Sequence, residues 1–186
     1  MAPKRRRSST ICRSSDLAQP SDLAQPSDGL KEEAEGHLAG GMEWPASREA
    51  MAAGRRFLLA CSKAHKKTVL VPDKDADGLA GAALIHRLLL LLGLPRDLLC
   101  VHLLQRGTNV HDDRERQALR RLAPEYAIVI DQGSRPGAAL VPQEDGATPC
   151  KTLLIDHHEA NVFPDDTDVV PVSVPFAGGP CPASAG

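Results

Sequence analysis

Residues 68–78 of the chain read TVLVPDKDADG. The first five are mostly β-branched or apolar and end in a proline, which predicts a short buried strand. Three aspartates, Asp73, Asp75 and Asp77, follow this strand at once. An apolar run, 78–92, comes next and predicts a helix that lies deep against a sheet. The stretch therefore predicts the first strand and helix of a βαβ unit, with acidic side chains at the turn between them.

Strand and helix patterns alternate on both sides of this stretch. Before it, the sequence predicts a helix that Ser47 caps and that ends near Lys66 and Lys67. The other predicted elements are strands at 98–104, 126–130, 151–155 and 168–174 and a charged amphipathic helix at 112–122. Strands and helices that alternate at this spacing form right-handed βαβ units. We therefore predict an α/β fold with an open, mainly parallel sheet and flanking helices.

The composition supports one such domain preceded by a tail. A chain of 186 residues holds one ordinary domain and not two. Aromatic residues make up only 3% of it, so Leu, Val, Ile and Ala must form the core, as they do in helix-covered parallel sheets. Residues 1–43 are poor in apolar side chains and contain the hexamer SDLAQP twice in succession, which predicts a disordered low-complexity tail. The α/β domain is then expected over 44–186.

The net charge, the cysteines and the possible targeting signals limit the functional classes and cellular compartments that fit this sequence. The formal net charge of −2 provides no general basic field for nucleic acid. The five cysteines are odd in number and form no CxxC pair, as expected of a reduced intracellular protein. The apolar run at 88–92 is too short to span a bilayer. The cluster KRRR at 4–7 fits a nuclear localisation signal and the Ser- and Arg-rich start fits a mitochondrial transit peptide, so nucleus, cytoplasm and mitochondrion stay open.

Side chains that bind metals follow three of the predicted strands. The acidic segment 73–77 follows the first, Asp131 the third, and Asp156, His157 and His158 the fourth. In an open parallel sheet, ligands bind in the crevice outside the carboxyl ends of the strands. Three loops therefore bring their carboxylates to one place, where mutual repulsion favours bound cations. Carboxylates combined with imidazole suit Mn²⁺ or Mg²⁺.

Each of these signals has a plainer interpretation when it stands alone. The pattern D-x-D-x-D-G also opens calcium-binding EF-hand loops, but the twelfth position, which must be Glu, is Leu84 here. A surface Asp-Gly turn is commonly only solvated, and an aspartate after a strand, such as Asp131, often caps a helix or forms a turn. The set also lacks the Cys/His spacing of a structural zinc site. It is the convergence of three loops that favours a metal centre.

The segments VLVPDKDADG, IVIDQG and LLIDHH, in this order, resemble motifs I, II and III of the DHH phosphoesterase superfamily, in its RecJ-like branch. The resemblance covers residues 68–161 and implies a site for two divalent metal ions. The metal ligands that it implies, with Asp131 as the bridge between the ions, are Asp73, Asp75, Asp77, Asp131 and His157. It also implies His158 and Asp156 as catalytic residues, His158 facing the substrate phosphate and Asp156 lying in or directly behind the ligand set.

The resemblance implies hydrolysis of a phosphodiester or phosphoanhydride by a water molecule that two metal ions activate. The implied partner is a phosphate-containing small molecule, such as a nucleotide, or a short single-stranded nucleic acid. The family pattern further implies a fourth aspartate and a second, substrate-binding domain after the DHH segment, and neither is found up to Gly186. We therefore expect a C-terminally incomplete domain, and a non-catalytic RecJ-like scaffold or binding module, or an inactive fragment, remains the alternative.

Histidines and arginines outside these motifs are interpreted as structural or solvated. His86 and His102 fall within a predicted helix and a predicted strand, where a hydrogen-bonded structural histidine is the common case. His111 lies in the loop after the second predicted strand, at the same sheet edge as the acidic segments, and is interpreted as part of a solvated loop. The arginines of the helix at 112–122 are interpreted as a solvated face.

Overall fold

The computed structural model describes residues 10–11, 46–143, 148–158, 160, 162–164 and 169–173. The strands are β1 (Thr10–Ile11), β2 (Thr68–Pro72), β3 (Leu99–His102), β4 (Tyr126–Ile130), β5 (Lys151–Asp156) and β6 (Val169–Ser173). The helices are α1 (Arg48–Ala64), α2 (Ala76–Leu91) and α3 (Asp113–Leu122), with a short 3₁₀ helix η2 (Arg96–Leu98). The strands form one sheet in the order β1-β3-β2-β4-β5-β6, in which β2 to β6 are parallel. The predicted open, mainly parallel α/β fold is thus confirmed.

Several sequence predictions fall on parts of the chain that the structure does not describe. The basic cluster at 4–7, the SDLAQP repeat and residues 174–186 lie outside the described residues. Thr10 and Ile11 belong to the segment predicted to be a tail, and they pair antiparallel with His102 and Val101 of β3. None of the described helices is long and apolar enough to cross a membrane.

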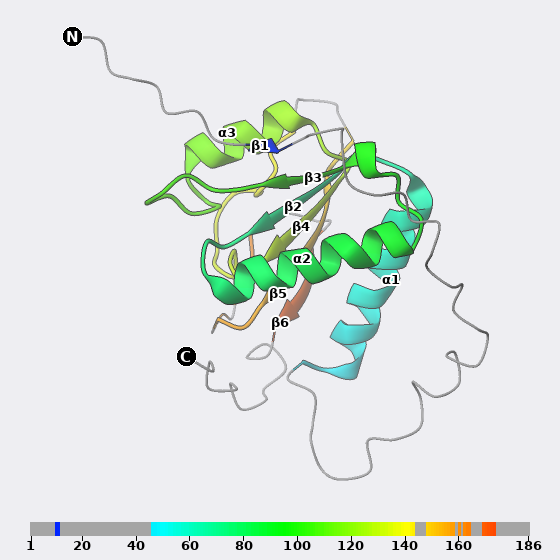
Figure 1. Ribbon diagram of the computed structural model, residues 1–186. Coiled ribbons are helices and arrows are strands. Elements are labelled where there is room, and N and C mark those ends of the chain that lie inside the picture. The colour runs from blue at the N-terminus through cyan, green and yellow to red at the C-terminus, as the bar shows by residue number, and fades with distance from the viewer. Residues whose placement is uncertain are drawn as a thin grey trace.

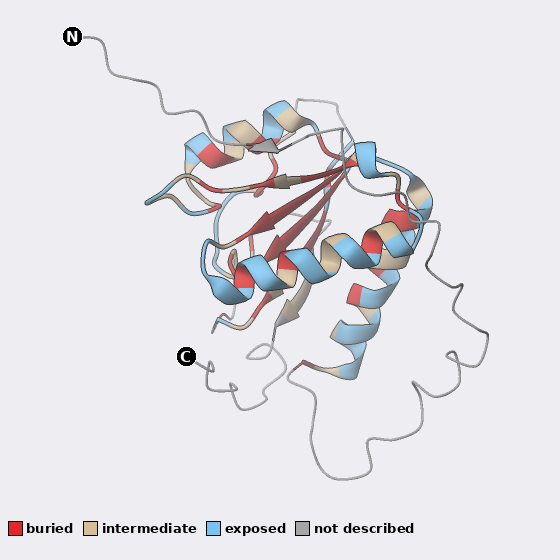
Figure 2. Ribbon diagram, in the orientation of Figure 1, coloured by how far each residue is buried: buried red, intermediate tan, exposed pale blue. Residues whose placement is uncertain are grey.

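The molecule has three layers, with helices on both faces of the sheet (Figure 1). Side chains alternate between the two faces along each strand. In β2, Val69 and Val71 pack in one core cluster with Leu119 of α3, whereas Leu70 packs in the other with Phe57 of α1 and Leu89 of α2. Figure 2 shows the result, in which the central strands β2 and β4 are buried at every position between the outer helices. Because both faces are covered, these central strands are mostly apolar.

Local sequence signals predicted most boundaries of the helices and strands to within one or two residues. Ser47 caps α1 as predicted, its Oγ accepting a hydrogen bond from Ala50 N at 3.1 Å. The strands predicted at 68–72 and 126–130 have the observed bounds. The strand predicted at 98–104 is shorter, because Pro95 begins a 3₁₀ turn that occupies residues 96–98. The strand β5 extends one residue beyond its predicted end at residue 155, so Asp156 belongs to the sheet.

The prediction that α2 lies deep in the protein is wrong. The buried residues of α2 are Gly78, Ala82 and Leu89, while Leu84 is 71% and Leu91 64% exposed. A helix in the outer layer can press only one stripe against the sheet, and the outer side of α2 faces away from it (Figure 2). An apolar sequence therefore does not by itself place a helix in the interior.

Candidate metal centre

The strand order creates a crevice between the carboxyl ends of β2 and β4. From β2 the chain passes through α2 to β3 on one side, and from β3 it returns through α3 to β4 on the other. The two crossover helices cover opposite faces of the sheet (Figure 1). Parallel sheets bind ligands where the chain reverses direction in this way. The loops after β2, β4 and β5 meet here, since Asp73 N donates to Ile130 O at 2.9 Å and Asp131 N to Ile155 O at 2.8 Å.

The loop after β2 is shaped by a helix cap. Asp75 is the N-cap of α2, and its Oδ1 accepts a hydrogen bond from Gly78 N at 3.2 Å. This cap orients the first turn of α2, which carries Asp77. A hydrogen bond from its own backbone amide, followed by one involving Asp75, holds the pKa of Asp77 below its usual range. The sequence D-A-D-G therefore places two acidic side chains side by side at the start of α2.

The backbone of Asp73 lies so close to residue 78 that only glycine fits there. A Cβ atom at residue 78 would lie 2.9 Å from Asp73 O and 3.0 Å from Asp73 N. Gly78→Ala is therefore expected to destabilise the fold by about 1–3 kcal/mol, although alanine is normally the better helix residue by about 1 kcal/mol. Denaturant unfolding measures the change. The reverse substitution at an exposed position of the same helix, Ala83→Gly, should cost only about 1 kcal/mol, and a stabilised Gly78→Ala protein would contradict the close approach.

Asp131 is the most unusual residue of the centre. Its backbone has φ +61°, in the left-handed region that non-glycine residues rarely adopt. The residue is only 8% exposed, and its Oδ1 lies 3.0 Å from His157 Nε2. Its Oδ2 is buried and has no hydrogen-bond partner among the described residues. Burial and then the charge of Asp77 raise the pKa of Asp131 to about 6, against the opposing effect of His157.

The loop after β5 presents the two neighbouring histidines. Asp156 is 5% exposed, and its carboxylate accepts hydrogen bonds from Ser134 N and His158 N, each at 3.1 Å. His158 Nδ1 lies 2.7 Å from Asp156 Oδ1, and the rings of His157 and His158 meet edge to face with centroids 4.6 Å apart. Burial disfavours the imidazolium of His158, but the hydrogen bond and charge of Asp156 outweigh it and raise the pKa of His158.

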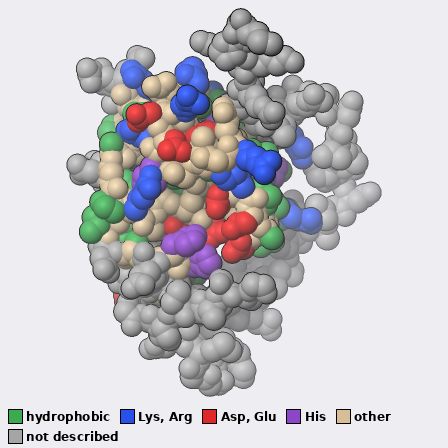
Figure 3. All heavy atoms as spheres, turned by 90° about the vertical axis from the view of Figure 1, so that its left-hand side faces the viewer, with side chains coloured by type: hydrophobic (Ala, Val, Ile, Leu, Met, Phe, Trp, Pro, Cys, Tyr) green, Lys and Arg blue, Asp and Glu red, His purple; other side chains and the backbone are tan. Residues whose placement is uncertain are grey.

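Two groups of side chains are close enough to hold metal ions. Asp75, Asp77 and Asp131 form one and Asp131, His157 and His158 the other, with the ligand atoms of each group within 4.8 Å of one another. Two ligand atoms held about 2.1 Å from an octahedral ion lie about 3 Å apart, which is the separation of Asp131 Oδ1 and His157 Nε2, 3.0 Å. Figure 3 views this edge of the sheet and shows histidine and acidic side chains gathered together. Oxygen and imidazole donors of this kind fit Mn²⁺ or Mg²⁺.

The structure thus brings together most of the residues predicted for the site. Asp75 and Asp77 lie with Asp131 in one group, His157 and His158 lie with Asp131 in the other, and Asp131 is the residue that the two groups share. Asp73 lines the adjoining cavity but belongs to neither of the two groups found among the described residues. Asp156 uses its oxygens to hold Ser134 N and His158, so it positions the histidine and is not itself arranged as a metal ligand.

Several residues of the cavity beside the centre were not predicted. Gln132 is buried and joins two strand ends, donating from Nε2 to Val71 O at 3.2 Å and accepting at Oε1 from Val110 N at 3.3 Å. His111, interpreted as part of a solvated loop, is half-buried and lines the cavity, with Nε2 3.2 Å from Gly133 O. Its place in the loop after β3, at the same sheet edge, was the one sequence signal for this role.

The remaining histidine and arginine predictions are partly confirmed. His102 is a buried structural histidine, with Nε2 2.8 Å from Glu115 Oε2, and His86 is half-buried in α2. The predicted solvated face of α3 is confirmed for Arg114, which is exposed. It is wrong for Arg116, whose Nε donates to Ala139 O at 2.9 Å and ties α3 to the loop before β5.

Comparison with protein-family models, with curated proteins and with solved structures gave no match. The likeness of the three motifs to DHH phosphoesterases therefore stays a prediction from the sequence. Function must be inferred from the residues of the metal centre and from the cavity beside it.

Proposed function

We propose that this chain is a metal-dependent phosphoesterase domain that hydrolyses a phosphodiester or a phosphoanhydride. The single observation that carries the proposal is the Asp131 carboxylate, which is shared by both candidate ligand groups and has a buried oxygen without a partner among the described residues. A buried carboxylate oxygen without a donor is costly. Coordination of a cation satisfies it, and the left-handed backbone of Asp131 is strain of the kind found at functional sites.

The ligand set suits two divalent ions, Mn²⁺ or Mg²⁺. Asp75 and Asp77 would each serve one ion, Asp131 would bridge them, and His157 would complete the set. When bound, such ions neutralise the carboxylates, polarise a phosphoryl group and lower the pKa of water to near 7. Asp73 lines the cavity beside the set and is the further candidate ligand. The substrate would be a small phosphate compound or a short single-stranded nucleic acid.

His158 would act on the substrate, and Asp156 would position its ring. Asp156 holds His158 Nδ1 at 2.7 Å, so the Nε2 side of the ring is left to face the cavity. The hydrogen bond and charge of Asp156 raise the pKa of His158 against the effect of burial, which favours the protonated ring. An imidazolium in this place can donate a hydrogen bond to a phosphate oxygen and give its proton to the leaving oxygen.

A direct assay tests the proposal. The purified chain with Mn²⁺ is expected to release p-nitrophenol from bis(p-nitrophenyl) phosphate, and EDTA should abolish the release. His157→Ala should lower the rate at least about 10- to 100-fold, because loss of even an indirect metal contact has that effect. His86→Gln, in a histidine that does not line the cavity, should leave the rate unchanged.

Calorimetric titration with Mn²⁺ separates the proposal from its alternative. Mn²⁺ binding that depends on Asp131 but is accompanied by no hydrolysis of any phosphoester would favour a metal-binding scaffold. Absence of Mn²⁺ binding by the wild-type chain would contradict the metal centre itself.

A further inference from the structure

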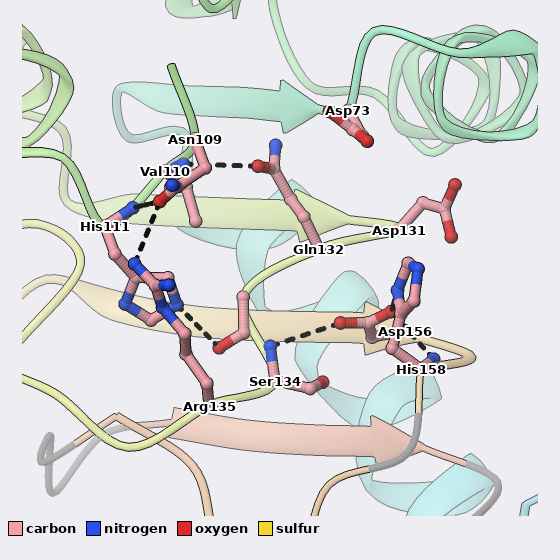
Figure 4. Close-up of a pocket in the computed structure, with 11 residues that line it drawn as sticks. Asp73, Asn109, Val110, His111, Asp131, Gln132, Ser134, Arg135, Asp156 and His158 are labelled. Carbon is pink, nitrogen blue, oxygen red and sulfur yellow. Dashed lines mark hydrogen bonds and ion pairs between the residues drawn. The ribbon is translucent and has the colours of Figure 1, made fainter. Parts of the chain in front are cut away.

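The cavity beside the metal centre has two chemically different ends. It has a volume of about 250 Å³. One end is formed by Asp131, Asp156 and His158 of the centre, and the other by Asn109, His111 and Arg135. Figure 4 shows the two sets on opposite sides, with Ser134 between them. The second end is made by the loop after β3 and by the loop after β4, and the proposed hydrolysis makes no use of it.

Arg135 is held in place at this second end. Its Nη2 donates to Asn109 Oδ1 at 3.1 Å, and its backbone N donates to Gly133 O at 2.8 Å. Asn109 Oδ1 also accepts from His111 N at 2.9 Å, so the two loops are joined here. Within the described part of the chain, the bond from Nη2 to Asn109 Oδ1 is the single hydrogen bond of the Arg135 guanidinium group. A guanidinium carries five N–H donors, so Arg135 keeps donors for a ligand.

Two further observations point to an anion at this end. Ser134 lines the same cavity between its two ends (Figure 4), and its Oγ is buried without a hydrogen-bond partner among the described residues. Burial and then the charge of Arg135 lower the pKa of His111, against the effects of the Gly133 carbonyl and the Asp112 carboxylate. Among the described lining residues, Arg135 supplies the positive charge at this end, across the cavity from Asp131 and Asp156. Arginine binds phosphate through paired, charge-assisted hydrogen bonds.

We propose that Arg135, with the Ser134 hydroxyl, forms a second anion subsite, which selects substrates that carry a second phosphoryl group next to the scissile one. This inference rests on the proposed function and names the substrate class as a compact phosphoanhydride. The cavity is smaller than the roughly 300–1,000 Å³ of pockets that enclose drug-sized ligands. None of the described residues that line it is Phe, Tyr or Trp, the side chains on which nucleobases stack in single-stranded nucleic-acid sites.

The reaction at such a substrate balances as follows. The oxygen of water would form a bond to the phosphorus held at the candidate metal centre, and the bond from that phosphorus to the bridging oxygen would break. The bridging oxygen would keep the electron pair, take a proton from His158 and leave as part of the phosphate held by Arg135. The proton lost by the water passes to solvent, from which His158 is protonated again. Arg135 stabilises the charge of the leaving phosphate.

Kinetics of two substrates test the subsite. With Mn²⁺ present, Arg135→Gln is expected to raise KM for pyrophosphate about 10- to 100-fold, the effect of losing a charge-assisted hydrogen-bond pair. Hydrolysis of bis(p-nitrophenyl) phosphate, which has no second phosphoryl group, should change less than about twofold because the Arg135 contact is not used. Arg106→Gln makes the same change of charge at an exposed residue that does not line the cavity and should alter neither substrate. Equal effects of Arg135→Gln on both substrates, or none on either, would overturn the subsite.

Binding of methylenediphosphonate, which cannot be hydrolysed, separates the two proposals. Calorimetry with and without Mn²⁺ should show binding that Arg135→Gln weakens about 10- to 100-fold and that Arg106→Gln does not change. If binding depends on Arg135 but the wild-type chain hydrolyses no phosphoester, the subsite stands and the proposed function falls. If hydrolysis is observed but methylenediphosphonate binds equally well to wild type and Arg135→Gln, the function stands and the subsite falls.

Discussion

Asp131→Asn is expected to reduce Mn²⁺-dependent phosphoester hydrolysis by at least about 100-fold, beyond the roughly 10- to 100-fold loss caused by removing an indirect metal contact. Asp131 belongs to both candidate ligand groups, so the substitution weakens the binding of both ions at once. The side chain keeps its size, and asparagine is among the residues that best tolerate the left-handed backbone at φ +61°. The loss therefore reports charge and coordination, and not a change of shape. Initial rates and calorimetric Mn²⁺ titration measure it.

The same substitution should stabilise the metal-free fold above pH 6. A carboxyl group whose pKa rises from 3.8 to about 6 on folding binds more protons in the folded than in the unfolded state between these pH values. Stability consequently falls as pH rises through this window, by roughly 3 kcal/mol at its upper end. Asp131→Asn removes this pH-dependent loss of stability. The variant should therefore be more stable than wild type by the full amount at pH 8 and equally stable below about pH 4, as measured by denaturant unfolding in EDTA.

Asp97→Asn is the matched control, because Asp97 is exposed and lies in η2, before β3 and away from the strand ends that carry the centre. It should change neither hydrolysis nor Mn²⁺ affinity. Full Mn²⁺ affinity in Asp131→Asn would remove the basis for the metal centre. A metal-free Asp131→Asn protein less stable than wild type at pH 8 would show that the surroundings of the buried carboxyl group do not disfavour its ionised form.

Glu115→Ala should destabilise the protein by about 3–5 kcal/mol, as expected when a buried, hydrogen-bonded ionic group is removed. Glu115 is 1% exposed in α3 and lies with Oε2 2.8 Å from His102 Nε2. Its Oε1 accepts hydrogen bonds from Gln105 N at 3.0 Å and from Thr108 Oγ1 at 2.7 Å. These contacts fasten the loop after β3, which carries Asn109 and His111 to the cavity. Thermal or denaturant unfolding measures the loss.

The effect of Glu115 should depend on pH. Burial opposes ionisation, but the hydrogen bonds from Gln105, Thr108 and His102 outweigh it and hold the pKa of Glu115 below its ordinary value of 4.5. The stabilisation by this carboxylate is therefore present above pH 4.5 and is lost as pH falls toward the lower folded value. Wild type and Glu115→Gln should thus approach each other in stability in acid.

Glu125→Ala is the matched control for Glu115→Ala. Glu125 forms an ion pair with Lys66 at 3.4 Å in which both side chains are more than half exposed, 54% and 53%. Such pairs contribute about 0–1 kcal/mol. Similar losses in the two alanine variants would contradict a structural role for the buried His102–Glu115 pair.

Local patterns in the chain were sufficient for the elements and for their chemistry. The run TVLVP and the run YAIVI are mostly β-branched or apolar and are bounded by proline or charged residues, so each could be assigned as a buried strand with its observed bounds. Ser47 predicted the start of α1 through capping, which depends only on residues three positions apart. The start of α2, predicted at Gly78, lies at Ala76 because Asp75 caps the helix. Because parallel strands end at one sheet edge, the acidic segments could also be placed together.

The strand order and the environment of each side chain depend on contacts between distant residues, and the sequence carried no local signal for them. Only the folded chain shows that β4 lies beside β2, which puts Asp131 next to Asp73 and makes the crevice. The same packing buries Asp131, turns its backbone to φ +61° and leaves its Oδ2 without a partner among the described residues. It also joins Arg135 to Asn109 across 26 positions of the chain. Burial, pKa and pairing arise from such long-range packing, so residue types predicted the metal centre, and tertiary contacts set its geometry.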